Sequence, residues 1–418
     1  MKVLIKQATI VNSTSPFNGH VKDIYIKDGI IITIADTITE KADKIIEAKN
    51  LSISIGWIDV FSHFCDPGYE HRETLETGAK AAAAGGFTEV MVMPNTNPVI
   101  HSKSQVEYII QKSKDLSVTI HPIGAITKNT EGKELAEMYD MQQSGAIAFS
   151  DGNNSIQQPG ILLKALQYVL AFDGTVIQLP DDKSISPHGL MNEGIVSTQL
   201  GLPGKPAIAE ELMIARDIEL VKYTGSKIHF TGVSTKKSIE LITKAKADGL
   251  KITCSVTPYH VFFCDEDLST YDTNLKVNPP LRTKEDMLAL REAIKKGTID
   301  CFSSHHIPQN ADSKICEFEY AKNGMVGLET LFGSILSITD NPSLVVEQLT
   351  IAPRKIFGLP IPEIKEGAIA NLTLFDTTTE FTVEESMIKS KSKNSAFVGK
   401  KLKGKVIGIL HGGKLELN

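Results

Sequence analysis

Residues 56–94, GWIDVFSHFCDPGYEHRETLETGAKAAAAGGFTEVMVMP, contain the pattern that decides the fold. Two apolar runs, at 56–61 and 88–94, flank the alanine-rich stretch ETLETGAKAAAAGG, which has the composition of a helix. Strand, helix and strand in this order predict two parallel strands joined by a crossover helix. The alternation continues along the chain, and the eight expected strands are 56–61, 88–94, 118–124, 146–150, 175–179, 227–232, 251–256 and 298–304.

The number of units predicts the architecture. Eight strand and helix units over roughly 250 to 300 residues favour a (β/α)8 TIM barrel. A doubly wound sheet is the alternative, because periodicity alone does not show whether a sheet closes. Short β-branched runs at both ends of the chain predict two β segments that could pair into one domain. We therefore divide the chain into a barrel, residues 56–355, and a composite β domain built from residues 1–55 and 356–418.

The composition is that of an ordinary globular protein. The chain has 418 residues, of which 41% are hydrophobic, so it can bury a large core. The net charge is −6 and the two signs are interspersed without a basic stripe, so we expect no nucleic-acid partner. Five scattered cysteines favour reduced thiols and a cytoplasmic location. No apolar run reaches the roughly 18 residues of a membrane span, so no membrane partner is expected.

Polar residues follow the expected strands. His63 and Cys65 come after the first strand, Asp151 after the fourth, and His305 after the eighth. The carboxyl ends of barrel strands meet at one rim, where histidine, aspartate and cysteine would form a metal or acid–base site. Any strand-to-helix loop is polar, however, and a single histidine there is more often a hydrogen-bonded surface residue than a ligand. The pattern alone leaves both interpretations open.

The motifs resemble one enzyme family over essentially the whole chain. The segment 56–98, the motif VSTKKSIELITKAKADGLKIT at 233–253 and the motif LKVNPPLRTKEDM at 275–287 resemble class I dihydroorotases of the amidohydrolase superfamily and their allantoinase and hydantoinase relatives. The resemblance implies a barrel with a composite β-sandwich. It also implies ring closure of N-carbamoyl-aspartate to dihydroorotate, with zinc polarising a carbonyl and activating water, and an aspartate acting as base.

The resemblance also implies that most zinc ligands have been replaced. His63 and Asp151 match the family's ligands, whereas three ligand histidines are replaced by Phe61, Gln178 and Gly232. His305 stands where the family has the aspartate that is both ligand and base. Phenylalanine has no lone pair to give to zinc, and a side-chain amide is a poor ligand. We expect dihydroorotase activity to be lost or very weak, and no resident cofactor.

Substrate-contacting positions are partly kept. Asn95 and Asn278 match family positions that contact substrate. Cys65 stands where the family has an arginine, whose planar fork would grip a carboxylate, and Gln309 stands where it has a histidine. The resemblance therefore predicts that the original substrate is bound poorly.

Three alternatives follow for the site. His63, Cys65, Asp151 and His305 could hold one zinc ion in a rebuilt centre of an active dihydroorotase or a related cyclic amidohydrolase. Alternatively, His63 and Asp151 form a hydrogen-bonded pair in a pocket that binds no metal. A third interpretation is a binding module for an acidic metabolite, anchored by the two retained asparagines.

The leading hypothesis is a non-catalytic homologue. The chain resembles dihydroorotase-like subunits without activity, which implies a structural or regulatory role in pyrimidine biosynthesis. Such subunits assemble with aspartate carbamoyltransferase, so that enzyme is the expected partner. We also expect a homo-oligomer, with a dimer as the default.

Overall fold

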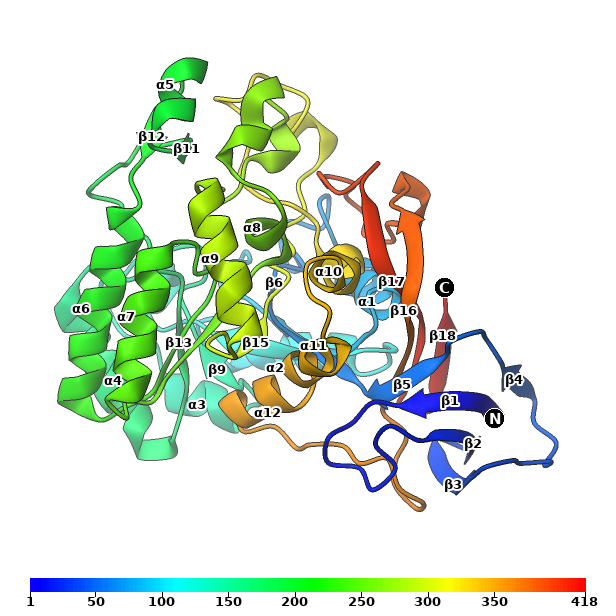
Figure 1. Cartoon of the computed structure of the whole chain (residues 1–418). Helices are drawn as coiled ribbons and strands as arrows, with labels where there is room; N and C mark the ends of the chain where they lie inside the picture. The colour runs from blue at the N-terminus through cyan, green and yellow to red at the C-terminus, as the bar shows by residue number, and fades with distance from the viewer.

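The computed structural model describes all 418 residues, as a barrel and a β-sheet built from both ends of the chain (Figure 1). All eight predicted barrel strands are present and pair in parallel, in chain order. The strands are β6 (Trp57–Ser62), β7 (Phe87–Val92), β8 (Thr119–Gly124), β9 (Ala148–Phe149), β10 (Val176–Gln178), β13 (Ile228–Phe230), β14 (Ile252–Val256) and β15 (Cys301–Phe302).

The first and last strands meet and nearly close the barrel. Ser62 forms a parallel bridge with His306, and the backbone N–H of His63 donates to the carbonyl of His306 at 2.8 Å. Below this bridge, the carboxylate of Asp59 accepts from the backbone N–H of Ser304 at 2.6 Å. The barrel prediction is confirmed, and the doubly wound alternative is wrong because its edge strands would not pair.

Helices cover the outside of the barrel. The alanine-rich stretch forms α1, whose N-cap Thr74 accepts from the backbone of Thr77. A Cβ at Gly78 would lie 2.6 Å from the ring of Phe64, so this helix needs small residues to pack closely on the barrel. The helices are α1 (Leu75–Ala84), α2 (Lys103–Ser113), α3 (Met138–Gln143), α4 (Pro159–Val169), α5 (Ile195–Leu200), α6 (Ile208–Thr224), α7 (Lys236–Ala247), α8 (Pro258–Phe262), α9 (Lys284–Lys295), α10 (Leu328–Leu336), α11 (Pro342–Leu349) and α12 (Ile351–Phe357).

Both ends of the chain contribute to the second sheet. Its path runs β18–β17–β16–β5–β1–β2–β3, with β4 paired to β1, and β5 joins the halves because it pairs with β1 on one side and β16 on the other. Its own apolar core is rich in isoleucine and leucine. The strands are β1 (Lys2–Ile10), β2 (Val21–Lys27), β3 (Ile30–Ala35), β4 (Lys44–Ile46), β5 (Ser52–Ile55), β16 (Leu372–Thr382), β17 (Lys401–His411) and β18 (Lys414–Leu417).

A buried charged cluster joins the sheet to the amino-terminal end of the barrel. Glu89 on β7 accepts from Arg354 at 2.5 Å, from Asn371 at 3.3 Å and pairs with His121 at 2.9 Å. Burial raises the pKa of Glu89, but the His121 hydrogen bond and the Arg354 charge outweigh it and hold the pKa at about 2. This end of the barrel therefore keeps full charges, each with a partner of opposite sign.

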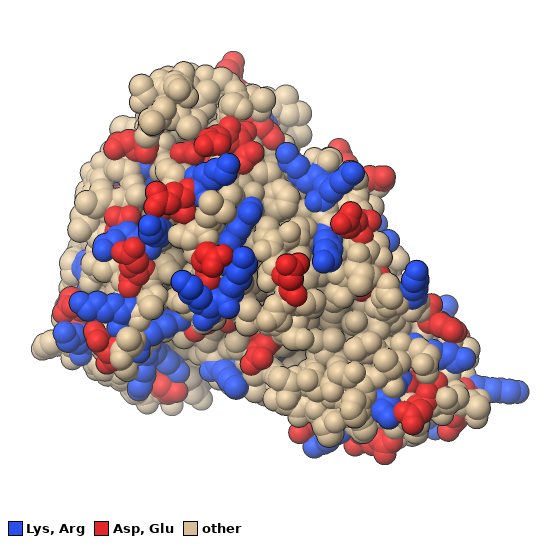
Figure 2. Space-filling view, viewed as in Figure 1, with Lys and Arg blue, Asp and Glu red and all other residues tan.

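Two features bear on the expected partners. An excursion between β10 and α6 carries α5 and the short pair β11 (Met191–Asn192) and β12 (Gly204–Lys205), which projects from the barrel in Figure 1. Basic and acidic residues are mixed over the face drawn in Figure 2, without a continuous basic stripe. None of the helices is both long and apolar enough to cross a bilayer.

Candidate functional site

The predicted site residues gather at the carboxyl ends of the barrel strands. Phe61 lies on β6, Gln178 ends β10, and Gly232 follows β13. His63 and Cys65 follow β6, Asp151 follows β9, and His305 follows β15. All of them are buried, so the rim expected from the sequence exists, but it is closed by its own side chains.

Both ring nitrogens of His63 are engaged by the protein. The backbone N–H of Cys65 donates to Nδ1 at 2.9 Å, so the proton of the neutral ring is on Nε2, which donates to the carbonyl of Asn95 at 2.9 Å. Burial, with the charge of Arg72 adding to it, lowers the pKa of His63 to about 4. A metal ion needs a free imidazole lone pair. The only lone pair in the ring plane already accepts a hydrogen bond, so His63 offers no donor.

Cys65 lies against the same histidine. Its Sγ is 3.0 Å from His63 Nδ1, and its backbone is left-handed with φ of 61°. Burial raises the pKa of the thiol to about 12. A thiolate is the form that binds metals and attacks carbonyl carbons. In the metal-free chain Cys65 is therefore held as a neutral thiol.

Asp151 is bound to the neighbouring loop. Its Oδ1 accepts from the backbone N–H groups of Ile126 and Thr127, each at 2.9 Å, and its Oδ2 accepts from the Thr127 hydroxyl. Burial raises the pKa of Asp151 to about 6 despite these bonds. His63 and Asp151 do not bond to each other, so the hydrogen-bonded pair expected as one alternative is wrong. Asn95 lies between them, because its amide donates to the Asp151 carbonyl at 3.0 Å.

His305 fills space that a side chain at position 232 would need. A Cβ on Gly232 would lie 2.7 Å from Cε1 of His305, and the His305 ring stacks on Phe61 with centroids 4.9 Å apart. Its Nε2 bonds to the Thr231 hydroxyl at 2.7 Å, whereas Nδ1 is buried without a partner. Burial lowers the pKa of His305 to about 3. The three replacements at these positions thus pack as one unit around a neutral imidazole.

Gln178 has a structural partner outside the rim. Its amide donates to the carboxylate of Asp217 on α6 at 3.3 Å. Burial raises the pKa of Asp217 to about 6, although the adjacent Arg216 forms an ion pair with it at 2.7 Å. The side-chain amide of Gln178, at the position where the family has a histidine, therefore forms a hydrogen bond to a carboxylate on α6.

Asn278 lines an open cavity at the barrel mouth. Its Oδ1 accepts from Lys205 at 2.8 Å, and its Nδ2 donates to Asp181 at 3.2 Å. The cavity holds about 420 Å³ and is also lined by Lys183 and Asn153. Lys205 and Asp181 form an ion pair at 2.7 Å, so two of the charged groups at this mouth neutralise each other. Sequence reasoning missed both of them, because Lys205 comes from the β11–β12 excursion.

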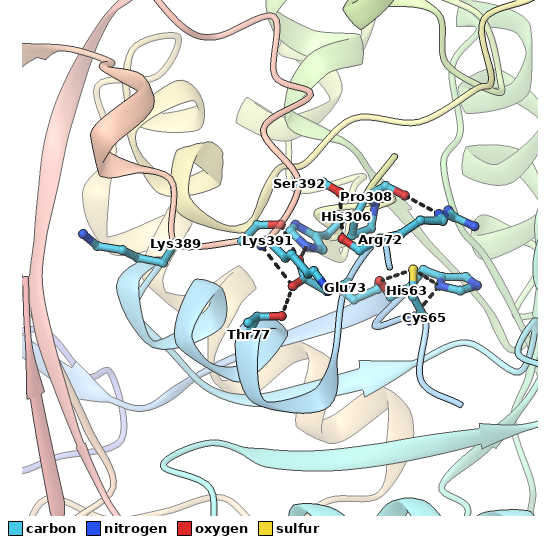
Figure 3. A network of polar contacts seen from close by, with 12 residues as sticks. His63, Cys65, Arg72, Glu73, Thr77, His306, Pro308, Lys389, Lys391 and Ser392 are labelled. Atoms are coloured by element: carbon cyan, nitrogen blue, oxygen red, sulfur yellow. Dashed lines mark hydrogen bonds and ion pairs between the residues drawn. The ribbon is translucent and has the colours of Figure 1, made fainter. Parts of the chain in front are cut away.

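A second buried network, drawn in Figure 3, also escaped the sequence analysis. Glu73, before α1, lies 3.3 Å from Nε2 of His306 and accepts from the backbone N–H of Lys391 at 3.1 Å. The hydroxyls of Thr77 and Ser390 donate to the same carboxylate. Glu73 therefore ties three distant segments together. Glu73 lies within residues 56–94, the stretch that decides the fold, and this position was the one sequence feature that could have pointed to it.

The donor set does not fit zinc. Nowhere in the chain do three or more histidine, cysteine, aspartate or glutamate side chains come together in a way that could hold a metal ion. The two retained family ligands both use their lone pairs on the protein itself, as described above. Gln309, at another family position, is also turned to the protein, since its amide donates to the carbonyl of Asn323 at 2.7 Å. The site as built is a packed polar core whose imidazole rings are neutral.

Known proteins show which family this is. A family model described as dihydro-orotase-like matches residues 52–238. A protein named dihydroorotase from Acetivibrio thermocellus is 41% identical over 99% of this chain and 98% of its own length. Another from Pelotomaculum thermopropionicum is 40% identical over 100% of this chain and 99% of its own.

Solved structures agree on the fold. An L-hydantoinase from Arthrobacter aurescens superimposes with a TM-score of 0.84 at 23% identity, covering 100% of this chain and 97% of that one. A likeness at this identity speaks for the barrel architecture alone. With the relatives at 40% identity and above, however, the assignment is plain. The chain belongs to the dihydroorotase family of amidohydrolase-fold proteins.

Proposed function

We propose that this protein is a dihydroorotase-like component of pyrimidine biosynthesis that has lost zinc-dependent catalysis and acts as a structural or regulatory partner of aspartate carbamoyltransferase. One observation carries the proposal. One ring nitrogen of the retained ligand His63 accepts a hydrogen bond from a backbone N–H, and the other donates to a backbone carbonyl. Freeing a lone pair would require the ring to give up its bond from the Cys65 backbone N–H.

The position of the family's base supports the same conclusion. His305 is fully buried, and its pKa of about 3 keeps the imidazole neutral. A general base must reach the proton that it removes, within about 3 Å or through one water molecule. A ring packed between Phe61 and Gly232 has no such access. Loss of base and ligands together removes both contributions of the family mechanism.

The intact scaffold supports a role as a partner. The 41% identical dihydroorotase is matched over 98% of its length, so the altered mouth is not accompanied by a shortened fold. The barrel and the terminal sheet remain packed against each other through Trp57, whose ring lies 4.6 Å from Phe332 and 5.3 Å from Phe375. A protein that keeps its fold but not its chemistry still presents a surface for assembly.

Activity is tested with the purified chain, after expression with added zinc. Dihydroorotate hydrolysis and N-carbamoyl-aspartate cyclisation are followed by absorbance and by product separation, next to a metal-loaded active dihydroorotase. We expect no rate above the uncatalysed reaction. Metal-dependent turnover that disappears in Asp151→Asn would contradict the proposal and support the single-zinc enzyme instead.

Partnership is tested separately by co-expression with aspartate carbamoyltransferase from the same organism. We expect the two chains to elute together in size-exclusion chromatography, and a barrel of similar mass from another family to elute alone. If both proteins stay separate at physiological concentration, the partner role fails whatever the activity assay shows.

A further inference from the structure

A second cavity lies beside the barrel mouth and is rich in lysine. It holds about 500 Å³ and is lined by the loop after β15 and by the segment that follows β16, including Lys314, Lys391 and Lys393. This volume is within the range of small-molecule sites. Gln309 lies on its wall, and its bond to Asn323 separates this cavity from the one that contains Asn278.

Lys314 is a buried cation without an anionic partner. It is 7% exposed, and its Nζ donates only to backbone carbonyls, to Thr273 at 2.8 Å and to Lys276 at 3.5 Å. Behind it, Lys276 is 4% exposed and likewise donates only to carbonyls. Burying an ammonium group is costly unless an opposite charge or neutralisation compensates. Burial, with the Lys276 charge adding to it, lowers the pKa of Lys314 to about 7.

The other two lysines are fixed over the same cavity. Nζ of Lys391 donates to the carbonyl of Glu70 at 2.6 Å, and Nζ of Lys393 donates to that of Ser390 at 2.9 Å. Their segment is anchored by Glu73, as Figure 3 shows. None of the three lysines forms an ion pair, and Glu385 is the acidic residue on this wall. Three lysines without ion-pair partners therefore line one cavity against a single carboxylate.

Gln309 gives an independent indication of a ligand. Its Oε1 is buried and has no hydrogen-bond partner, while its Nε2 is fixed on the Asn323 carbonyl. Exchanging the two amide atoms would place two oxygens together, so the orphaned atom is the acceptor. An unsatisfied buried acceptor costs about 1–3 kcal/mol. Gln309 lines the cavity, so a ligand N–H or O–H group that displaces the atoms covering Oε1 would satisfy it.

We infer that this cavity is a binding site for a small phosphate monoester that also carries a hydroxyl or amino group. A phosphate monoester has about −1.5 to −2 charge and three strong acceptor oxygens, which matches three lysines that come from two separate segments of the chain. A single carboxylate matches the cavity less well, because it brings one charge and two oxygens. Gln309 would accept from the ligand's donor group.

The probes are inorganic phosphate, glycerol 3-phosphate and acetate, measured by calorimetry with the full-length chain at constant ionic strength. We expect glycerol 3-phosphate to bind most tightly, inorganic phosphate more weakly and acetate not measurably. The variant Lys391→Gln/Lys393→Gln changes two exposed side chains and should weaken glycerol 3-phosphate at least tenfold. Lys389→Gln, in the same segment but outside the cavity, is the matched control and should bind as the native chain does.

Two further outcomes decide the inference. Gln309→Leu should remove the preference for glycerol 3-phosphate over inorganic phosphate while leaving phosphate binding in place. Equal weakening by Lys389→Gln and by the double variant would indicate non-specific charge attraction and overturn the site, as would absence of binding to the native chain. Acetate binding as tight as phosphate would overturn the assignment to phosphate monoesters.

Discussion

The two ends of the barrel handle buried polar groups in opposite ways. At the amino-terminal end, Glu89 and Arg354 keep full charges and pair at 2.5 Å. At the carboxyl-terminal end, His63 and His305 are buried as neutral rings, with pKa values lowered to about 4 and about 3. Barrel enzymes carry their chemistry at the carboxyl-terminal end and their stability at the other. At these residues the two ends differ in whether a buried group is charged and paired or held neutral.

The difference bears on our proposal that the mouth holds no metal. A charged pair is broken only at the cost of an isolated buried charge. A neutral cluster can be rearranged more cheaply, but every hydrogen bond to backbone must first be given up. At His63 and Asp151 those bonds are made with main-chain groups. We therefore propose that the retained family ligands act as parts of the fold.

The largest expected effect is at the charged end. Arg354→Met leaves Glu89 buried with only His121 and Asn371 beside it, and should lower the free energy of unfolding by about 3–5 kcal/mol. Urea denaturation followed by circular dichroism measures it. Lys295→Met, which removes the exposed pair with Glu292, is the matched control and should be almost neutral. Equal effects of the two variants would refute the contrast between the ends.

A smaller loss is expected at the neutral end. Gly232→Ala puts a Cβ 2.7 Å from His305 in a left-handed residue with φ of 70°, and should destabilise by about 2–4 kcal/mol. Gly225→Ala is the control, because its φ is 69° but nothing lies within 4 Å of the added atom. It should cost only about 1 kcal/mol of backbone strain. In a His305→Ala background the cost of Gly232→Ala should fall towards that of Gly225→Ala, whereas the cost of Gly225→Ala should be the same in both backgrounds.

The fold was predictable from local patterns, whereas the state of the site was not. The strand, helix and strand of residues 56–94 carry their own periodicity, and the family motifs extend it. The hydrogen bond to Nδ1 of His63 comes from the backbone N–H of Cys65, whose left-handed conformation is uncommon for a cysteine. The family motif placed His63 and Asp151 at the rim, but it did not indicate that both bond to the main chain.

Contacts over long sequence distances were also beyond prediction. Glu73 meets His306 across 233 positions, and Lys205 reaches Asn278 from an excursion that periodicity does not place. Polar side chains read one at a time give no indication of such partners. The composite sheet was easier, because β-branched runs at both ends of the chain needed neighbours to pair with.

The third prediction concerns pH. The expected change in the free energy of unfolding per pH unit is smaller than the effects of the two substitutions above. The folded pKa of His305, about 3, is below its ordinary value of 6.5, so between these values the unfolded chain binds a proton that the folded chain does not. Its contribution to stability is complete above pH 6.5 and is lost as the pH falls, by about 1.4 kcal/mol per unit. His305→Gln should flatten the curve of unfolding free energy between pH 6 and pH 4 by that slope. The exposed His188→Gln should leave it unchanged; an unchanged slope in His305→Gln would mean that the ring is not held neutral.

The most direct test of the central claim is the zinc content of the purified chain, by elemental analysis after expression with added zinc and dialysis without chelator. The account predicts far less than one zinc per chain, with no difference between the native protein and the variants His63→Gln and Asp151→Asn. A tightly held zinc near one per chain that disappears in either variant would contradict it, because His63 and Asp151 would then be ligands rather than parts of the packed core.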